Sequence, residues 1–169
     1  PRLVSALLRW AVNGLDDAAL YAVLASPLFA LADDVLLTLA SRQKREGGIG
    51  RRSMAHGFTD GPFAEHCALL GLGEGDIAAA EDARALLFRF RDEARRGRAA
   101  HGLRRLFAAS GALDRWQDEG ACGIARAANV AKAVRIVEDL APRCTGLASL
   151  AAAFDAHLAT AKEAPGALA

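Results

Sequence analysis

Cysteine is scarce in this 169-residue sequence, and the cysteines present lack the spacing of a metal site or a disulfide framework. Cys67, Cys122 and Cys144 are odd in number and form no Cys-x-x-Cys pair. Structural zinc sites and disulfide scaffolds need closely spaced or paired cysteines, so the sequence supports neither. We therefore expect a reducing compartment, a cytoplasmic location and no metal ligands in this chain.

Long hydrophobic runs are also missing. No apolar stretch reaches the roughly 18 residues that a membrane span requires, and residues 1–10 lack the charged region and small-residue cleavage site of a signal peptide. We expect no membrane partner. The chain begins with Pro1, and its only methionine is Met54. Either an initiator methionine has been removed, or the chain is an excised piece of a larger protein.

The sequence has no large excess of positive or negative charge, and it has few of the β-branched residues that favour strands. The chain has 21 Lys and Arg against 20 Asp and Glu, a net charge of +1, which excludes a uniformly basic surface but permits local basic clusters. Val, Ile and Thr total 15 residues, whereas Ala contributes 40 and Leu 24. Ala and Leu favour helices and β-branched residues favour strands. We predict an all-α fold, a compact bundle of about seven to nine helices.

Apolar periodicity and helix-ending residues organise the chain as a single domain, 1–169. Predicted helices span 2–13, 16–25, 32–44, 62–70, 76–96, 101–109, 113–117, 121–141 and 145–163. In the helix 76–96, apolar residues recur at intervals of three and four and predict a buried seam: Ala80, Ala83, Leu87, Phe90 and Ala94. The segment 46–61, rich in glycine and polar residues, is predicted to be a mobile loop.

No set of residues predicts a catalytic site. The glycine-rich segment 47–52 lacks the Lys-Ser/Thr ending of a phosphate cradle. His66 and Cys67 are neighbours on a predicted helix, so their side chains point about 100° apart and do not easily chelate one ion. We expect no catalytic residue, metal ligand or cofactor in this chain. A small helical enzyme that uses His66 or His101 is the least favoured hypothesis.

Two basic clusters are the most informative polar features. Arg84, Arg91, Arg95 and Arg98 step by 7, 4 and 3 residues, which predicts one helix face opposite the apolar seam. The second cluster has only Glu46 opposing it and consists of Arg42, Lys44, Arg45, Arg51 and Arg52. Such clusters suit the phosphate backbone of DNA. Solvated helix surface, with ordinary pairs such as Arg89 and Glu93, is the alternative.

Three stretches carry a resemblance to a known family. The first reads Val-Ser-Ala-Leu-Leu-Arg-Trp at 4–10, then Asp-Asp-Ala-Ala-Leu at 16–20 and Leu-Ala-Ser-Pro-Leu-Phe-Ala-Leu at 24–31. The second reads Leu-Phe-Ala-Ala-Ser-Gly-Ala-Leu at 106–113, followed by Trp116, and the third is Arg-Ala-Ala-Asn-Val at 126–130. In this order they resemble the accessory helical subdomain, termed 2B, of UvrD/Rep-type superfamily 1 DNA helicases. The Ser-Pro-Leu-Phe pattern is most similar to the branch of the exonuclease V beta chain and related helicase–nucleases.

The resemblance implies a helical subdomain inserted in a larger protein, so that this chain is an excised fragment. In that family, ATP and magnesium are bound by RecA-like lobes elsewhere in the parent chain, which is an ATP-dependent DNA helicase acting in recombination and repair. The helical subdomain contacts duplex DNA at the fork and partner subunits. Ser26 and Pro27, together with Arg126 and Asn129, match family motifs and are expected to have structural roles, the last two at a helix start or in buried hydrogen bonds.

One departure from the family bears on DNA binding. UvrD-type members carry a Gly-Ile-Gly loop whose amides approach a phosphate, whereas this chain has Ala30, Leu31 and Ala32. A Cβ at each position hinders close approach. The DNA-contact candidates are therefore the two basic clusters. The alternative hypothesis is a free-standing helical module for protein–protein interaction.

Overall fold

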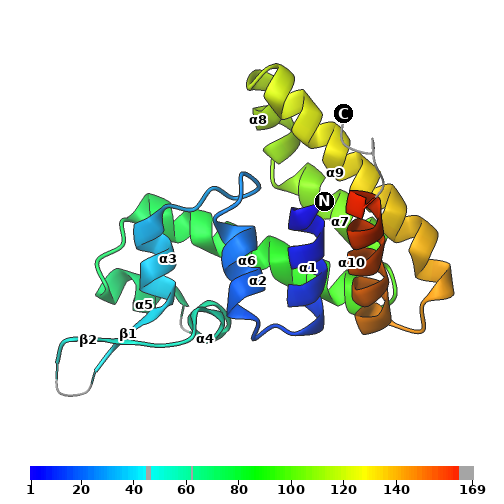
Figure 1. Ribbon diagram of the computed structural model, residues 1–169. Coiled ribbons are helices and arrows are strands. Elements are labelled where there is room, and N and C mark those ends of the chain that lie inside the picture. Colours follow the sequence, from blue (N-terminus) through cyan, green and yellow to red (C-terminus); the bar gives the residue numbers. More distant parts are fainter. Residues whose placement is uncertain (45–46, 62, 164–169) are drawn as a thin grey trace.

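The computed structural model describes residues 1–44, 47–61 and 63–163, and it confirms the all-α fold (Figure 1). The described residues form ten α-helices: α1 (Arg2–Val12), α2 (Asp17–Leu24), α3 (Asp33–Leu39), α4 (Met54–Thr59), α5 (Phe63–Leu69), α6 (Glu74–Arg95), α7 (Ala99–Ala109), α8 (Ala112–Asp118), α9 (Ala121–Leu140) and α10 (Leu147–Glu163). A 3-10 turn, Ala141–Arg143, follows α9, and two short strands, β1 (Ser41–Gln43) and β2 (Ile49–Arg51), form a hairpin.

The long helix α6 crosses the molecule and packs against α1, α3, α5 and α7. The predicted seam of α6 is confirmed, because all five of its residues are buried: Ala80, Ala83, Leu87, Phe90 and Ala94. Small alanines in this seam allow neighbouring helices to approach closely, while Leu87 and Phe90 fill the space between them. The helix α6 therefore joins α1, α3, α5 and α7 into one packed unit.

The prediction that 46–61 is a mobile loop is wrong for its described part. Residues 49–51 are paired in β2, and Met54–Thr59 form α4. Ser53 caps α4 by accepting a hydrogen bond from the His56 backbone N–H, and Phe58 is fully buried. Glycine and polar residues suggested a loop, but Gly57 lies against the Leu39 carbonyl, where a Cβ would be 1.8 Å from the oxygen. Close packing, and not mobility, explains that glycine.

The loop between α2 and α3 is attached to α8. The Trp116 indole N–H donates to the Pro27 carbonyl (3.3 Å), and Arg115 donates to the Leu28 carbonyl (2.7 Å). Within the loop, the Ser26 hydroxyl donates to the Val23 carbonyl (2.6 Å). Ser26 therefore contacts the end of α2, and Pro27 contacts α8.

Ala30 adopts the left-handed conformation, with φ of 52°. This conformation costs an L-residue with a Cβ about 1–2 kcal/mol and suits glycine. Among the non-glycine residues that the structure describes, Ala30 is the one with a positive φ, so this loop holds a strained backbone position.

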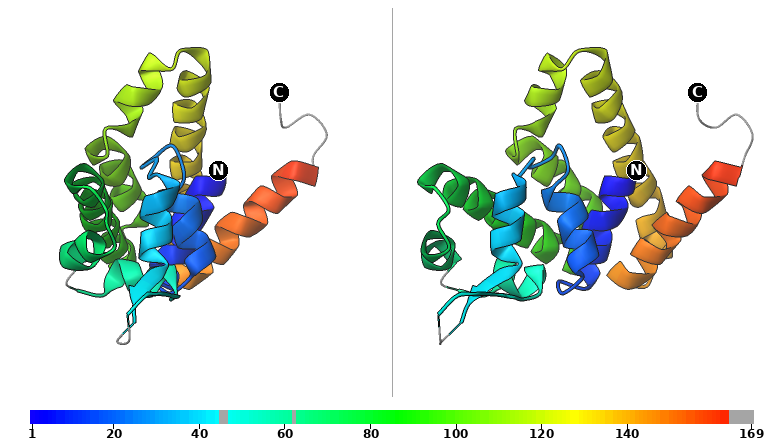
Figure 2. Two further views of the ribbon diagram at one scale, coloured as in Figure 1. Left: turned by 90° about the vertical axis from the view of Figure 1, so that its left-hand side faces the viewer. Right: turned by 60° about the vertical axis from the view of Figure 1, so that its left-hand side comes forward.

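The hairpin and the turn between α8 and α9 lie at opposite ends of the molecule, as all three views show (Figures 1 and 2). Within the described ranges, none of the helices combines the length and apolar character that crossing a membrane requires.

Candidate nucleic-acid interface

The β1–β2 hairpin projects beyond the helices at the lower left of Figure 1. Its strands are antiparallel, and Ser41, Arg42 and Gln43 face Arg51, Gly50 and Ile49 respectively. A further hydrogen bond joins the Lys44 N–H to the Gly48 carbonyl (3.0 Å). Because side chains alternate along a strand, Arg42 and Lys44 lie on one face of the hairpin, and Ile49 and Arg51 lie on the other.

Three of the predicted basic residues of this cluster are exposed on the hairpin: Arg42, Lys44 and Arg51. None of them forms an ion pair with an acidic residue in the described part of the chain. Gly50 leaves room for the stem of Lys44, whose Cε would be 2.9 Å from a Cβ there. Arg45 lies outside the described residues. The hairpin thus presents positive charge on both faces.

The base of the hairpin is fixed to the helices by several hydrogen bonds. The Arg52 backbone N–H donates to the Ala40 carbonyl (2.8 Å), and its side-chain Nε–H donates to the Leu39 carbonyl (3.3 Å). His66 Nε2 lies 3.0 Å from the Ser41 carbonyl oxygen. Burial lowers the pKa of Arg52. Arg52 therefore anchors the hairpin, and it is not one of the exposed cations.

The prediction that Arg84 lies on an open face opposite the seam is wrong. Its Nε and Nη2 donate to the carbonyls of Phe58 (2.7 Å) and Thr59 (3.0 Å), the last residues of α4. The guanidinium also lies over the rings of Phe63 and Phe88, at 5.4 and 5.2 Å from their centroids. These carbonyls have no partner within the helix, so Arg84 completes α4 and joins it to α6.

Arg91 is also partly buried, contrary to the prediction. Its guanidinium lies 5.4 Å from the Trp10 ring centroid and packs on Gly14, where a Cβ would be 2.4 Å from Nη1. Burial lowers the pKa of Arg91, and the neighbouring charge of Arg95 lowers it further. The side chain holds α6 against the turn after α1.

The other two residues of the first basic cluster, Arg95 and Arg98, do not share one face with Arg84 and Arg91. Arg95 is exposed in the last turn of α6, whereas Arg98 follows the helix and forms an ion pair with Glu93 (2.7 Å). Glu93 also lies 3.7 Å from Arg105. The expected pair between Glu93 and Arg89 is absent from the ion pairs of the described residues. Glu93 pairs instead with Arg98, just before α7, and with Arg105, in the second half of α7.

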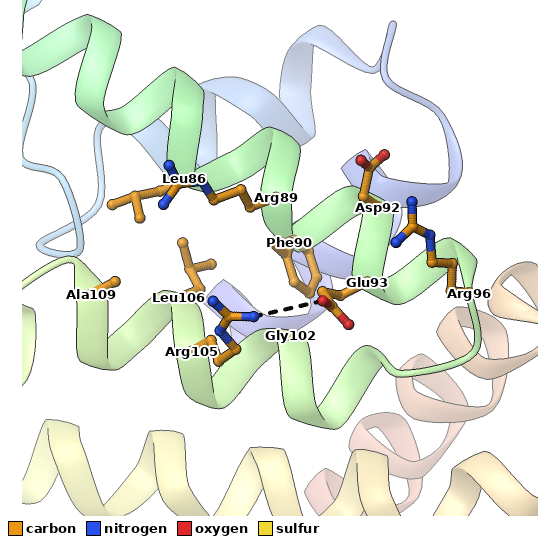
Figure 3. Close-up of a pocket in the computed structure, with 10 residues that line it drawn as sticks. All are labelled: Leu86, Arg89, Phe90, Asp92, Glu93, Arg96, Gly102, Arg105, Leu106 and Ala109. Atoms are coloured by element: carbon orange, nitrogen blue, oxygen red, sulfur yellow. Dashed lines mark ion pairs between the residues drawn. The ribbon is translucent and has the colours of Figure 1, made fainter.

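A hollow of about 280 Å³ lies between α6 and α7 (Figure 3). Leu86, Phe90 and Leu106 line its apolar part, and Arg89 extends from α6 while Arg105 extends from α7. Arg96 and the carboxylates of Asp92 and Glu93 complete the rim. The mixture of cations and apolar surface suits a ligand that has an acidic group and an apolar part. The carboxylates of Asp92 and Glu93 would repel the phosphates of a nucleic acid, so this hollow is a poor site for DNA.

Arg89, Arg96 and Arg105 were not among the individually named contact candidates, although they belong to the arginine-rich stretch 84–105. The spacing of seven residues between Arg89 and Arg96 places both on one side of α6. Arg105 comes from the next helix, so its neighbours on α6 follow only from the tertiary structure.

The third family-like stretch lies on α9. Arg126 forms an ion pair with Glu119 (2.6 Å) and lies 5.6 Å from the Trp116 ring centroid. It thereby links α9 to the end of α8 through a partly exposed ion pair. Asn129 is exposed in α9, and no side-chain hydrogen bond involves it among the described residues. The expected buried role of Asn129 is wrong.

The remaining polar candidates do not gather into a site. Cys67 is fully buried, and burial raises the pKa of its thiol. His66 contacts the base of the hairpin, and His101 is exposed on α7. Residues 1–44, 47–61 and 63–163 contain no group of three or more His, Cys, Asp or Glu that could hold a metal ion.

The exposed cations of the hairpin are therefore the strongest candidate for a phosphate contact. The comparisons with known proteins add no relative: no family model, no curated protein and no solved structure matches this chain.

Proposed function

We propose that this chain is a non-catalytic accessory domain of a cytoplasmic, ATP-dependent DNA helicase of the UvrD/Rep type, in the helicase–nuclease branch, acting in DNA recombination and repair. It contacts duplex DNA and positions it, or a partner subunit, while RecA-like lobes elsewhere in the parent chain bind ATP and magnesium. The observation that carries the proposal is the β1–β2 hairpin, which is hydrogen-bonded to the helices at its base and exposes three cations, Arg42, Lys44 and Arg51.

The hairpin has the properties that phosphate binding requires. Its cations project from both faces and have no described acidic partner, so they can approach phosphates without first breaking an ion pair. Each phosphate that they neutralise releases counterions, which favours binding at low salt. The anchored base lowers the entropy that the hairpin would lose on binding.

The packing of the family-like stretches gives further support. Pro27 from the first stretch and Arg126 from the third both contact Trp116, which follows the second. Segments about 90 residues apart in sequence (27 to 116) therefore form one packed unit. This is the behaviour expected if the three motifs together specify one type of subdomain.

The hollow between α6 and α7 favours the second candidate, a helical module for protein–protein interaction. Its apolar lining with Arg89, Arg96 and Arg105 at the rim suits an acidic segment of another protein. This candidate predicts binding of a partner protein with weak or absent DNA binding.

A salt titration of DNA binding tests the proposal. We expect the 169-residue chain to bind a fluorescent 20-base-pair duplex with an affinity that falls as salt rises. The triple variant Arg42→Ala, Lys44→Ala, Arg51→Ala should make the negative slope of log K against log [salt] shallower by about 2.7, or 0.9 for each lost phosphate contact.

A matched control removes three exposed cations elsewhere: Lys132→Ala, Arg135→Ala and Arg143→Ala. It changes the net charge equally, and it should leave the slope unchanged. An equal effect of the two triple variants, or no binding by the unmodified chain, would contradict the proposed role of the hairpin.

A further inference from the structure

We propose that the hairpin enters the major groove of duplex DNA and that Ile49 contacts the C5-methyl group of thymine there. This inference rests on the proposed function, because it names the surface of DNA that the hairpin meets. Its starting point is Ile49, a large apolar side chain that is 65% exposed on a projecting, cationic hairpin. Exposed sheet edges often carry charged residues, and Ile49 is the large exposed hydrophobic residue that lies among the cations of the hairpin.

The dimensions of the hairpin select the groove. Its two strands are separated by about 4.8 Å, and side chains extend from both faces. A two-stranded ribbon of this size fits the major groove, which is about 12 Å wide, whereas the minor groove is only about 6 Å wide. The major groove is also where thymine differs from the other bases by a methyl group.

The register of the strands gives the orientation. Ile49 lies opposite Gln43, and both share a face with Arg51, whereas Arg42 and Lys44 occupy the other face. With the Ile49 face toward the base edges, the amide of Gln43 lies beside the isoleucine and can pair with a base edge. Arg42 and Lys44 then face away from the bases and can reach the phosphates that border the groove.

The helices support this approach. The base of the hairpin is held at Ala40, Leu39 and Ser41 by the contacts of Arg52 and His66. Gly47 and Gly48, before β2, have positive φ values of 87° and 80°, and a Cβ at either would meet no atom within 4 Å. The chain beside Ile49 is therefore open to solvent, and a duplex can approach it without displacing other parts of the fold.

The test compares two duplexes that differ only in the methyl group, with every thymine of the first replaced by uracil in the second. The unmodified chain should bind the thymine duplex about fourfold more tightly, the factor that corresponds to burial of one methyl group, about 0.8 kcal/mol. Ile49→Ala should remove this preference while the salt slope stays unchanged, because neither the methyl group nor the isoleucine carries charge.

Leu37→Ala is the matched control, because Leu37 is 68% exposed on α3, outside the hairpin. It should keep the fourfold preference. Equal binding of the two duplexes by the unmodified chain, or a preference that survives Ile49→Ala, would overturn the inference and leave the proposed function standing. Failure of the unmodified chain to bind either duplex would instead overturn the proposed function, and the inference with it.

Discussion

The substitution Gly123→Ala is expected to destabilise the fold by about 3 kcal/mol or more. Gly123 lies in the first turn of α9, directly against the backbone of α8. A Cβ there would be 1.7 Å from the Trp116 carbonyl oxygen and 2.6 Å from its carbon. Backbone atoms cannot rotate away as a flexible side chain can, so α8 and α9 would have to separate. That separation would also disturb Trp116, a fully buried residue that holds the loop after α2.

Gly75→Ala provides the matched control. Gly75 is also in the first turn of a helix, α6, but a Cβ there meets no atom within 4 Å. Alanine is intrinsically better than glycine in a helix by up to about 1 kcal/mol, so this variant should be as stable as the unmodified chain or more stable. Urea unfolding followed by circular dichroism measures both. A neutral effect of Gly123→Ala would show that the α8–α9 contact is looser than the structure has it.

The second large effect is expected for Arg84→Met, which we predict to cost about 3 kcal/mol. Methionine keeps much of the apolar stem but removes the two hydrogen bonds to Phe58 and Thr59. Hydrogen bonds from charged groups contribute about 1.5–3 kcal/mol each, and the contacts with the Phe63 and Phe88 rings are lost as well. For a domain of this size, the midpoint of thermal unfolding should fall by about 6–12 °C.

Arg95→Met on the same helix tests whether the loss of charge alone is responsible. Arg95 is exposed and forms no ion pair with a described residue, so its replacement should change stability by less than about 0.5 kcal/mol. Arg84→Lys should restore little, because a single ammonium group does not reproduce the planar fork of the guanidinium. Similar effects of Arg84→Met and Arg95→Met would refute the role of Arg84 as the partner of α4.

The sequence predicted those parts of the fold that depend on one helix at a time. The seam of α6 follows from its own spacing, since residues three and four apart share a face whatever packs against it. The predicted start of the second helix at Asp16 also agrees with the structure, where the Asp16 carboxylate caps α2 by accepting a hydrogen bond from the Ala19 N–H (2.9 Å). Here local geometry alone fixes the result.

The arginines show what local spacing does not contain. Arg84 and Arg91 are seven residues apart and share a face as expected, but that face meets aromatic side chains from α5 and α1 and the last carbonyls of α4. An arginine beside such rings becomes a packing residue, with its apolar stem and planar head both covered. No pattern within α6 indicates that Phe58 and Trp10 lie there, so exposure was predicted where burial was found.

The hairpin was hidden for a different reason. Strands of three residues are too short to show an alternating pattern, so residues 41–43 were wrongly assigned to a predicted helix, 32–44, and residues 49–51 to a glycine-rich loop. The helix α3 ends at Leu39 instead. The basic composition of the segment nevertheless predicted a cluster of cations correctly, because charge is a property of the residues themselves. The structure added which of them project, Arg42, Lys44 and Arg51, and which one, Arg52, anchors the base.

The central claim is that this chain works as an accessory domain of a DNA helicase, and the natural protein tests it most directly. An antibody raised to the chain would isolate that protein for mass measurement and peptide mapping. We predict a mass several-fold larger than 17.7 kDa, with peptides that contain a Gly-x-x-x-x-Gly-Lys-Ser/Thr phosphate cradle. A natural protein of 17.7 kDa, or a larger one without that motif, would contradict the helicase assignment and favour the protein–protein interaction module.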